Sequence, residues 1–300
     1  MVNGFLNLYK PSGITSMEAV RQIKKPLGRI KVGHCGTLDP LAEGVLPIAI
    51  GTASRIVEYV LHESKTYKAR IQLGQTTDTF DSEGIVTNTH PTSHITSQLI
   101  QDTLKHYLGN ISQVPPIFSA LKRQGKPLYK YAREGQQIAI EPREVIIHNI
   151  DLLAVTNPYI DLRVECGAGT YIRSLAHDLG NSLGCGGHLS ALIREDSSGF
   201  NIADTVSLTT ITKNITQSPE DILKYLLPID APIKYIPKLG VTHLNALALR
   251  HGRQIPAHHH HQEWDSRSPL RRAYNPSSTF ISIIEFNDSN HTWKPVKVFY

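Results

Sequence analysis

The segment from Gly33 to Gly44 constrains the fold of this chain more than any other stretch. It contains three glycines and one proline, shows no helical period, and precedes an apolar run from Val45 to Ile50. Glycine permits backbone conformations that other residues avoid, whereas Pro40 restricts the preceding Asp39 to an extended conformation. The pattern predicts a stiff loop that holds the Asp39 carboxylate at a fixed angle before a buried strand. The alternative is that Asp39 only begins a turn, as Asp-Pro often does.

Composition and length indicate a folded protein outside the membrane. The chain has 300 residues, of which 40% are hydrophobic and 19% are charged, and this favours two globular domains over a disordered chain. No stretch approaches the roughly 18–20 apolar residues of a membrane helix, and the first residues do not resemble a signal peptide. Three separated cysteines, Cys35, Cys166 and Cys185, suit free thiols in a reducing compartment. We therefore expect a cytoplasmic protein that contacts no membrane.

Strands and helices are predicted in an irregular order. One helix is expected from Thr15, which begins a capping-box pattern, and another after the turn at 167–169, where we expect Thr170 to be the cap. The stretch 209–237 is polar and rich in proline, with one short helix predicted at 220–227. Without a strict βαβ rhythm, the mixture predicts an α+β fold rather than a doubly wound parallel sheet. Strands are predicted at residues 2–9, 45–50, 66–74, 144–155 and 159–166.

Positive charge is concentrated in two segments. Residues 115–143 hold six Lys or Arg against two acidic residues, and residues 236–300 hold eight against four. This suggests a polyanionic partner contacted at two places, although two solvated surfaces explain the charges equally well. The first segment is an insertion with a short helix predicted at 128–133. It also contains aromatic rings, and cations mixed with rings suit a flexible RNA loop.

Five sequence blocks, in the expected order, resemble those of the tRNA pseudouridine synthase B family. The first, Thr37–Ala42 followed by Gly44–Pro47, matches the catalytic motif of the family with Asp39 at the aspartate position. The resemblance spans roughly residues 4–200. Its other blocks lie at 65–67 with 73–79, at 115–122 with 125–135, at 169–180, and at 187–194.

The resemblance implies an isomerase that converts a uridine of RNA to pseudouridine. In the family's reaction the base is detached at N1, rotated and rejoined to its sugar through C5, and the implied substrate is the uridine at tRNA position 55 in the TΨC loop. Nothing is oxidised and no group is imported, so we expect neither a cofactor nor a metal. The sequence agrees, because it has no phosphate-binding glycine loop and no spaced Cys/His cluster.

The resemblance also assigns active-site residues. Asp39 is the catalytic carboxylate, and Arg173 is the cation that keeps it negative inside a pocket, since the charge of an arginine survives burial. The ring of Tyr67 stacks on the flipped uracil, and its hydroxyl assists proton transfer. Whether Asp39 attacks the base, attacks the ribose or accepts a proton stays open. Further positions that line the substrate pocket in the family are matched by His34, Tyr171 and Leu192.

The resemblance implies a fold with two RNA contacts. Residues 1–235 form a mixed, mainly antiparallel central sheet flanked by helices, with an RNA-binding thumb inserted at about 115–143. Residues 236–300 are similar in layout to a small β-rich PUA domain, expected on the acceptor stem while the thumb holds the T-arm. We interpret His258–His261, which depart from the family, as a solvated loop, with metal binding as the alternative. The predicted thumb contacts are Lys122, Arg123, Lys126, Lys130 and Arg133.

We expect a monomer that needs no protein partner, but two other functions stay open. A relative that modifies ribosomal RNA within a guide-RNA complex shares the aspartate loop, although such proteins carry extra terminal segments. A non-catalytic RNA-folding chaperone would keep the binding surface and lose the chemistry. Activity on a naked tRNA transcript discriminates both from the tRNA enzyme.

Overall fold

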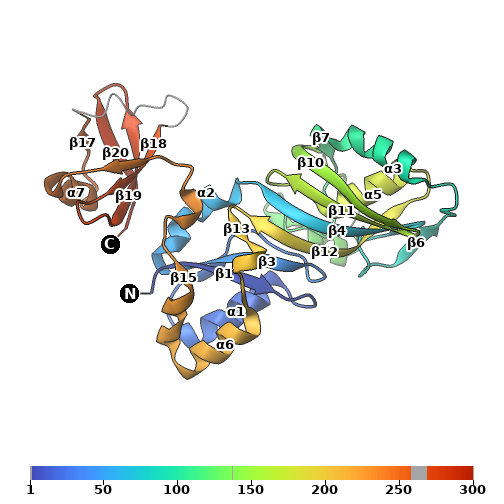
Figure 1. The fold of residues 1–300 in the computed structure, drawn as a ribbon, viewed down its shortest axis with the longest axis horizontal. Coiled ribbons are helices and arrows are strands. Elements are labelled where there is room, and N and C mark those ends of the chain that lie inside the picture. Colours follow the sequence, from blue (N-terminus) through green and yellow to red (C-terminus); the bar gives the residue numbers. More distant parts are fainter. Residues whose placement is uncertain (1, 137, 258–268, 300) are drawn as a thin grey trace.

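The computed structural model describes residues 2–136, 138–257 and 269–299, and it confirms the predicted α+β class. Within these residues a mixed sheet of eleven strands is the largest element (Figure 1). Its strands are β1 (Gly4–Lys10), β2 (Val32–His34), β3 (Glu43–Ile50), β4 (Lys65–Leu73), β7 (Gly109–Gln113), β10 (Arg143–Thr156), β11 (Tyr159–Cys166), β12 (Gly187–Ser197), β13 (Phe200–Asn201), β14 (Val206–Ser207) and β15 (Leu226–Leu227).

The strand order explains why distant segments meet. The main path is β14-β1-β3-β12-β4-β11-β10-β7, and β2, β13 and β15 pair with its members. Most neighbours are antiparallel, whereas β3 pairs with β12, and β1 with β14, in parallel. Two small hairpins leave the sheet: β5 (Gln75–Thr77) with β6 (Val86–Thr89), and β8 (Lys122–Arg123) with β9 (Lys126–Pro127).

The structure has helices where the sequence predicts them from Thr15, at 128–133 and after the turn at 167–169. The short helix predicted at 220–227 is instead a 3₁₀ helix at 219–225 followed by a strand at 226–227. The helix expected at Thr15 begins there with a complete capping box, since Thr15 Oγ1 accepts from the Glu18 amide at 3.1 Å and the Thr15 amide donates to the Glu18 carboxylate at 2.7 Å. The α-helices are α1 (Ser16–Leu27), α2 (Val57–Leu61), α3 (Ser97–Leu104), α4 (Leu128–Arg133), α5 (Ile172–Ser182), α6 (Leu208–Gln217) and α7 (His243–Arg250). The 3₁₀ helices are η1 (Gly51–Ile56), η2 (Lys105–Tyr107), η3 (Ile202–Asp204), η4 (Pro219–Tyr225) and η5 (Ala231–Ile233).

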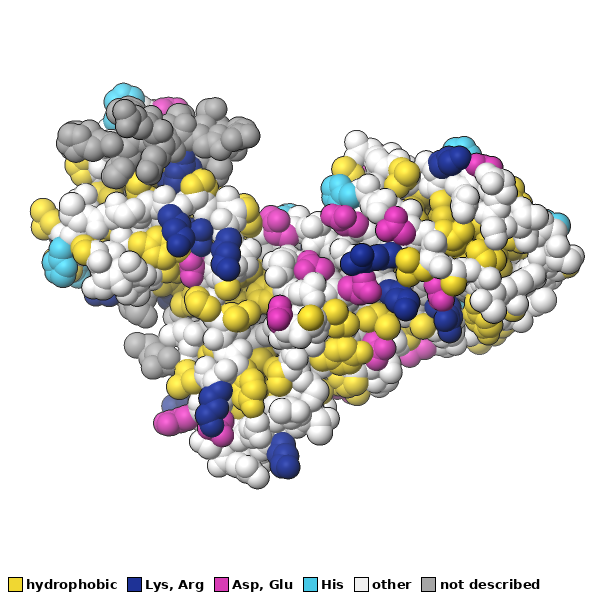
Figure 2. Space-filling view, in the orientation of Figure 1, with side chains coloured by type: hydrophobic (Ala, Val, Ile, Leu, Met, Phe, Trp, Pro, Cys, Tyr) yellow, Lys and Arg dark blue, Asp and Glu magenta, His cyan; other side chains and the backbone are white. Residues whose placement is uncertain are grey.

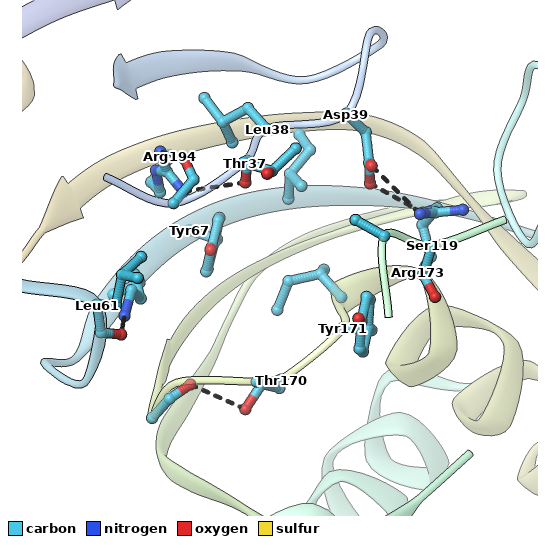
Figure 3. A pocket seen from close by; sticks show the side chains of 17 residues that line it. Thr37, Leu38, Asp39, Leu61, Tyr67, Ser119, Thr170, Tyr171, Arg173 and Arg194 are labelled. Carbon is cyan, nitrogen blue, oxygen red and sulfur yellow. Dashed lines mark hydrogen bonds and ion pairs between the residues drawn. The ribbon is translucent and has the colours of Figure 1, made fainter. Parts of the chain in front are cut away.

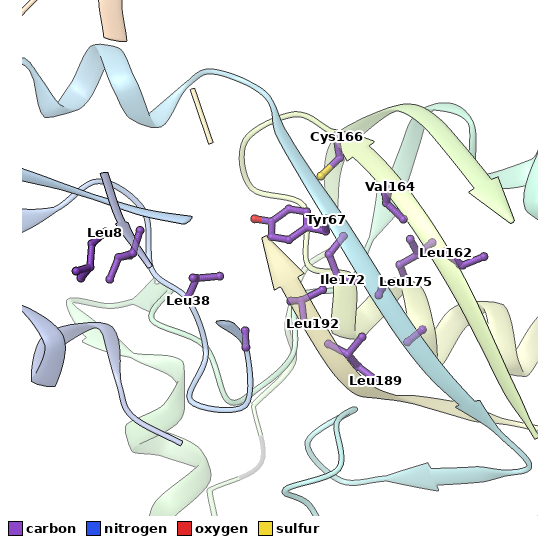
Figure 4. Close-up of a cluster of buried hydrophobic side chains, with 14 of the residues drawn as sticks. Leu8, Leu38, Tyr67, Leu162, Val164, Cys166, Ile172, Leu175, Leu189 and Leu192 are labelled. Atoms are coloured by element: carbon purple, nitrogen blue, oxygen red, sulfur yellow. The ribbon is translucent and has the colours of Figure 1, made fainter. Parts of the chain in front are cut away.

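Strand β4 illustrates how the large sheet acquires one buried face. Tyr67, Ala69 and Ile71 are buried, whereas Lys68 and Arg70 between them are exposed, as the two-residue period of a strand requires. Helix α5 contacts β12 and β4, and α3 contacts β10 and α5, on the buried side. Figure 4 shows the resulting apolar cluster, with Tyr67 at the edge that faces the loop before β3.

The opposite face of the large sheet carries balanced charge. Arg70 pairs with Asp161 at 2.8 Å, and Arg163 pairs with Glu195 at 2.8 Å, so basic and acidic side chains alternate across β4, β11 and β12. Figure 2 shows the two signs interspersed over the middle of the sheet. This face therefore lacks the single-sign potential that attracts a polyanion.

A second sheet of five strands occupies the C-terminal part of the chain. Its order is β16 (Lys238–Gly240), β18 (Leu270–Tyr274), β19 (Phe280–Asn287), β20 (Thr292–Val298) and β17 (Ile255–Pro256). Arg55 Nη1 donates to the Val298 carbonyl at 2.7 Å across the junction with the large sheet (Figure 1). The boundary near residue 235 stays a prediction, and His258–His261 lie outside the described residues. An apolar cluster shared by both sheets includes Phe5, Phe200, Ile236, Ile283 and Phe299.

Two other local predictions were wrong. Helix α6 lies in the stretch 209–237, where only a short later helix was expected, and it buries Leu208, Ile211 and Ile215. Thr170 does not cap α5, because its hydroxyl donates back to the Gly167 carbonyl at 3.1 Å. In the part of the chain that the structure describes, no helix is long and apolar enough to span a membrane.

Candidate active site

The loop between β2 and β3 carries Asp39 and is fixed on both sides of it. Ser16 at the start of α1 bonds Leu38 twice: its hydroxyl donates to the Leu38 carbonyl at 2.9 Å and accepts from the Leu38 amide at 2.8 Å. Beyond Asp39, the Pro40 carbonyl accepts from the Gly13 amide at 2.8 Å and from Lys10 Nζ at 3.4 Å. The stiffness expected from glycine and proline therefore also depends on bonds from β1, the following turn and α1.

Arg173, in the first turn of α5, holds the Asp39 carboxylate with two parallel hydrogen bonds. Nε donates to Oδ2 at 2.9 Å and Nη2 donates to Oδ1 at 3.2 Å. The Arg173 side chain is 5% exposed and that of Asp39 is 34% exposed, so a buried cation anchors a carboxylate that stays accessible. Figure 3 shows this pair, brought together from segments 134 residues apart. Such two-point pairing fixes the plane of a carboxylate as well as its position.

The same guanidinium also forms an ion pair with a second carboxylate, that of Asp81, which sequence reasoning missed. Asp81 Oδ2 lies 3.6 Å from Arg173 Nη1, and the Asp81 side chain is 5% exposed. Its other oxygen accepts from Thr79 Oγ1 at 2.6 Å and from the Glu83 amide at 3.1 Å. Asp81 lies two residues after the recognised 73–79 block, and this proximity was the only signal the sequence offered for it.

Arg173 also contacts the backbone of two other segments. Nη1 donates to the Thr79 carbonyl at 3.2 Å, and Nη2 donates to the Phe118 carbonyl at 2.9 Å. Phe118 lies near the start of the basic insertion 115–143. The arginine therefore connects Asp39, the turn that bears Asp81, and the base of the predicted thumb.

A cavity of about 260 Å³ opens beside the Asp39–Arg173 pair. Since one water takes about 30 Å³ of the liquid, this space admits a pyrimidine ring. Three of the residues expected at the substrate pocket line it: Tyr67 and Tyr171, which Figure 3 labels, and Leu192. His34, the fourth, is half-buried on β2 and does not line this cavity.

Two titratable groups in the cavity wall are strongly affected by burial. Burial raises the pKa of the Tyr67 phenol, and the nearby Arg194 charge only partly opposes this, so the hydroxyl is protonated at neutral pH. Burial lowers the pKa of Lys65 to about 8, and its ammonium donates to the carbonyls of Leu61 and Glu63. Lys65 lies in the 65–67 sequence block, but no role was predicted for it from sequence.

The basic insertion presents its cations beside its aromatic rings. Lys126 forms an ion pair with Glu134 and lies 4.4 Å from the ring centre of Tyr131, while Arg133 lies 5.5 Å from that of Tyr129. Because the Glu134 carboxylate neutralises the charge of Lys126, the net positive charge of this segment comes mainly from its other Lys and Arg side chains. The predicted contacts that are exposed at this surface are Lys122, Arg123, Lys130 and Arg133.

Among the described residues, no group of three or more His, Cys, Asp or Glu side chains is arranged to hold a metal ion. The ionisable side chains that line the cavity are the Asp39 carboxylate, the phenols of Tyr67 and Tyr171, and the cations Lys65, Arg173 and Arg194.

Comparison with known proteins relates this arrangement to a class of RNA-modifying enzymes. The model for the TruB family pseudouridylate synthase N-terminal domain matches residues 24–172, and that for the tRNA pseudouridylate synthase B C-terminal domain matches residues 173–234. The tRNA pseudouridine synthase B of Dehalococcoides mccartyi strain CBDB1 is 38% identical over 99% of this chain and 97% of its own length. That of Syntrophotalea carbinolica is 44% identical over 80% of this chain and 78% of its own length.

Solved structures give the same answer for the fold. A chain in the crystal structure of a Cbf5-Nop10-Gar1 complex superposes with a TM-score of 0.73 at 26% identity, covering 99% of this chain and 84% of that one. The fold and the matched family models are those of a pseudouridine synthase, an isomerase. The chain belongs to the TruB family of these enzymes.

Proposed function

We propose that this chain isomerises the uridine at position 55 in the TΨC loop of tRNA to pseudouridine. The observation that carries the proposal is the bidentate Asp39–Arg173 pair at 2.9 and 3.2 Å beside a cavity of pyrimidine size. The tRNA pseudouridine synthase B relatives, similar over nearly the full chain, supply the substrate class.

The geometry supports a division of labour among the cavity residues. The target base must leave its stack, which costs a few kcal/mol, and stacking on the Tyr67 ring returns about 1–3 kcal/mol. The N1–C1′ bond then breaks, the base turns, and a C5–C1′ bond forms, while the proton lost from C5 is balanced by one gained at N1. Asp39 is the group that acts on the nucleotide, and Arg173 holds its carboxylate in one plane. The protonated Tyr67 hydroxyl is suited to donate a hydrogen bond to the detached base.

The proposal extends to how the tRNA is held. Lys122, Arg123, Lys130 and Arg133 on the thumb face the T-arm, with Lys126 restrained by Glu134, and the C-terminal sheet contacts the acceptor stem. The chain acts in the cytoplasm as a monomer, without a protein partner.

The test is pseudouridine mapping in a tRNA transcript incubated with purified protein and no additives. The parent protein is expected to modify position 55, and Asp39→Asn is expected to bind the same transcript and leave it unmodified. Binding by the parent without product would favour an RNA-folding chaperone. Product that appears only on a guided ribosomal RNA would favour the guide-dependent relatives. Product from Asp39→Asn would contradict the catalytic assignment.

A further inference from the structure

Arg194 is a buried cation whose bonding pattern the reaction chemistry does not yet explain. It lies on β12, is 1% exposed, and is among the largest fully buried side chains. It forms no ion pair with a carboxylate among the residues that the structure describes. Instead, three of its nitrogens donate to backbone carbonyls: Nε to Val45 at 2.7 Å, Nη2 to Gly36 at 3.1 Å and Nη1 to Thr37 at 3.4 Å.

These carbonyls lie at the two ends of the catalytic loop. Gly36 and Thr37 precede Asp39 by three and two residues, and Val45 follows it in β3. One planar guanidinium therefore joins the entry and the exit of the loop. Figure 3 shows Arg194 beside Thr37, above Tyr67 on the cavity wall.

The backbone places Arg194 against this loop independently of its side chain. Gly44 of β3 pairs in parallel with Arg194 of β12. Gly44 has a φ of +102°, and a Cβ there would lie 2.3 Å from the Arg194 carbonyl oxygen. Only glycine permits this approach, so the start of the arginine side chain is held at a fixed place relative to the loop.

We propose that Arg194 is a positioning residue for the isomerisation: by bonding both ends of the loop, it sets where the Asp39 carboxylate stands over the cavity. Its role differs from that of Arg173, which bonds the carboxylate itself. A lysine could not replace it, because an ammonium on a flexible stem lacks the planar fork that reaches three carbonyls in fixed directions. The inference rests on the proposed function, since it concerns the same reaction.

The experiment compares Arg194→Lys with Arg272→Lys in the full chain. Arg272, 4% exposed against 1% for Arg194, is a buried arginine on β18 of the C-terminal sheet. It bonds the Ile236 and Lys234 carbonyls and Asp230, so its guanidinium belongs neither to the catalytic loop nor to the exposed surface proposed to contact RNA. Near-UV circular dichroism first verifies that each variant is folded. The rate of single-turnover pseudouridine formation and the dissociation constant for tRNA are then measured for each protein. Because a misplacement of about 1 Å costs about 100-fold, we expect Arg194→Lys to slow the chemical step by about 100-fold with an unchanged dissociation constant. Arg272→Lys should leave the chemical step at the parental rate.

Two results would overturn the role of Arg194: a parental single-turnover rate in Arg194→Lys, or a rate loss matched by an equal loss of tRNA affinity. If Arg194→Lys does not fold, Arg194→Met takes its place, because an apolar side chain leaves no misplaced buried charge. Failure of both to fold while Arg272→Lys folds would assign Arg194 to the stability of the sheet and refute positioning. The parent protein distinguishes failure of this inference from failure of the proposed function. If the parent itself forms no pseudouridine, the proposed function is contradicted as well.

Discussion

Arg173→Ala removes the cation at the centre of the site together with four hydrogen bonds. Two of the bonds run to Asp39, and the others run to the carbonyls of Thr79 and Phe118. Asp81, only 5% exposed, is left as a buried carboxylate without its cation. Breaking a buried pair in this way costs about 3–5 kcal/mol, which we expect as the loss in free energy of unfolding.

The effect on the reaction should be larger than the effect on binding. Without its two-point anchor the Asp39 carboxylate is free to turn, and a misplacement of about 1 Å costs about 100-fold in rate. We therefore expect the single-turnover rate to fall by at least about 100-fold, measured with enzyme in excess over a tRNA transcript. The free energy of unfolding is measured by urea denaturation of the same preparation.

Arg163→Ala is the matched control for this substitution. Arg163 also pairs with a carboxylate, Glu195 at 2.8 Å, but its side chain is 54% exposed. A surface pair of this kind contributes about 0–1 kcal/mol, and Arg163 is not among the residues that line the cavity, so stability and rate should stay near parental values. A near-parental rate in Arg173→Ala would remove that arginine from the mechanism and refute the reasoning.

Four further outcomes are expected. Tyr67→Phe keeps the ring and loses the hydroxyl, so tRNA affinity should persist while the single-turnover rate falls; an unchanged rate would leave stacking as the only role of Tyr67. The affinity for tRNA should fall steeply with added salt, and a flat response would contradict binding by the basic segments. Burial raises the pKa of Cys35 to about 12 and that of Cys166 to about 11, so these thiols stay protonated at about pH 8 and should react with Ellman's reagent only after denaturation; rapid labelling of the native protein would show that they are accessible. Gly44→Ala should lower the free energy of unfolding by about 1–3 kcal/mol because the added Cβ meets the Arg194 carbonyl, whereas Gly33→Ala, whose Cβ would meet nothing within 4 Å, should not; equal effects would contradict the close approach of β3 and β12.

Features that depend on neighbours in the chain were predicted well from sequence. Three correct predictions each depend on residues close together in the sequence: the capping box at Thr15, the short helix at 128–133 and the buried strand after Gly44. The α+β class and the family also followed from local blocks. The conformational limits of glycine and proline predicted Asp39 on a stiff loop, although the bonds from Ser16, Lys10 and Gly13 that also fix this loop were not foreseen.

Features that depend on long-range contacts were missed or wrong. Threonine is a common helix cap, but Gln113 from β7 bonds both backbone groups of Tyr171 instead. Gln113 Nε2 donates to the Tyr171 carbonyl at 3.0 Å, and Gln113 Oε1 accepts from the Tyr171 backbone amide at 2.8 Å. Asp81 gains its importance only because α5 brings Arg173 to it. Helix α6 is polar in composition and is stabilised by packing its one apolar face, which includes Ile211, against α1.

The Phe118 carbonyl bonded to Arg173 links the base of the insertion, which we propose binds RNA, to the guanidinium that orients Asp39. The chain at Phe118 cannot shift without lengthening a 2.9 Å hydrogen bond to the very guanidinium that orients Asp39. Exchanging the insertion for that of a relative is therefore compatible with turnover only when the stem at Phe118 keeps its course, whatever the sequence farther out.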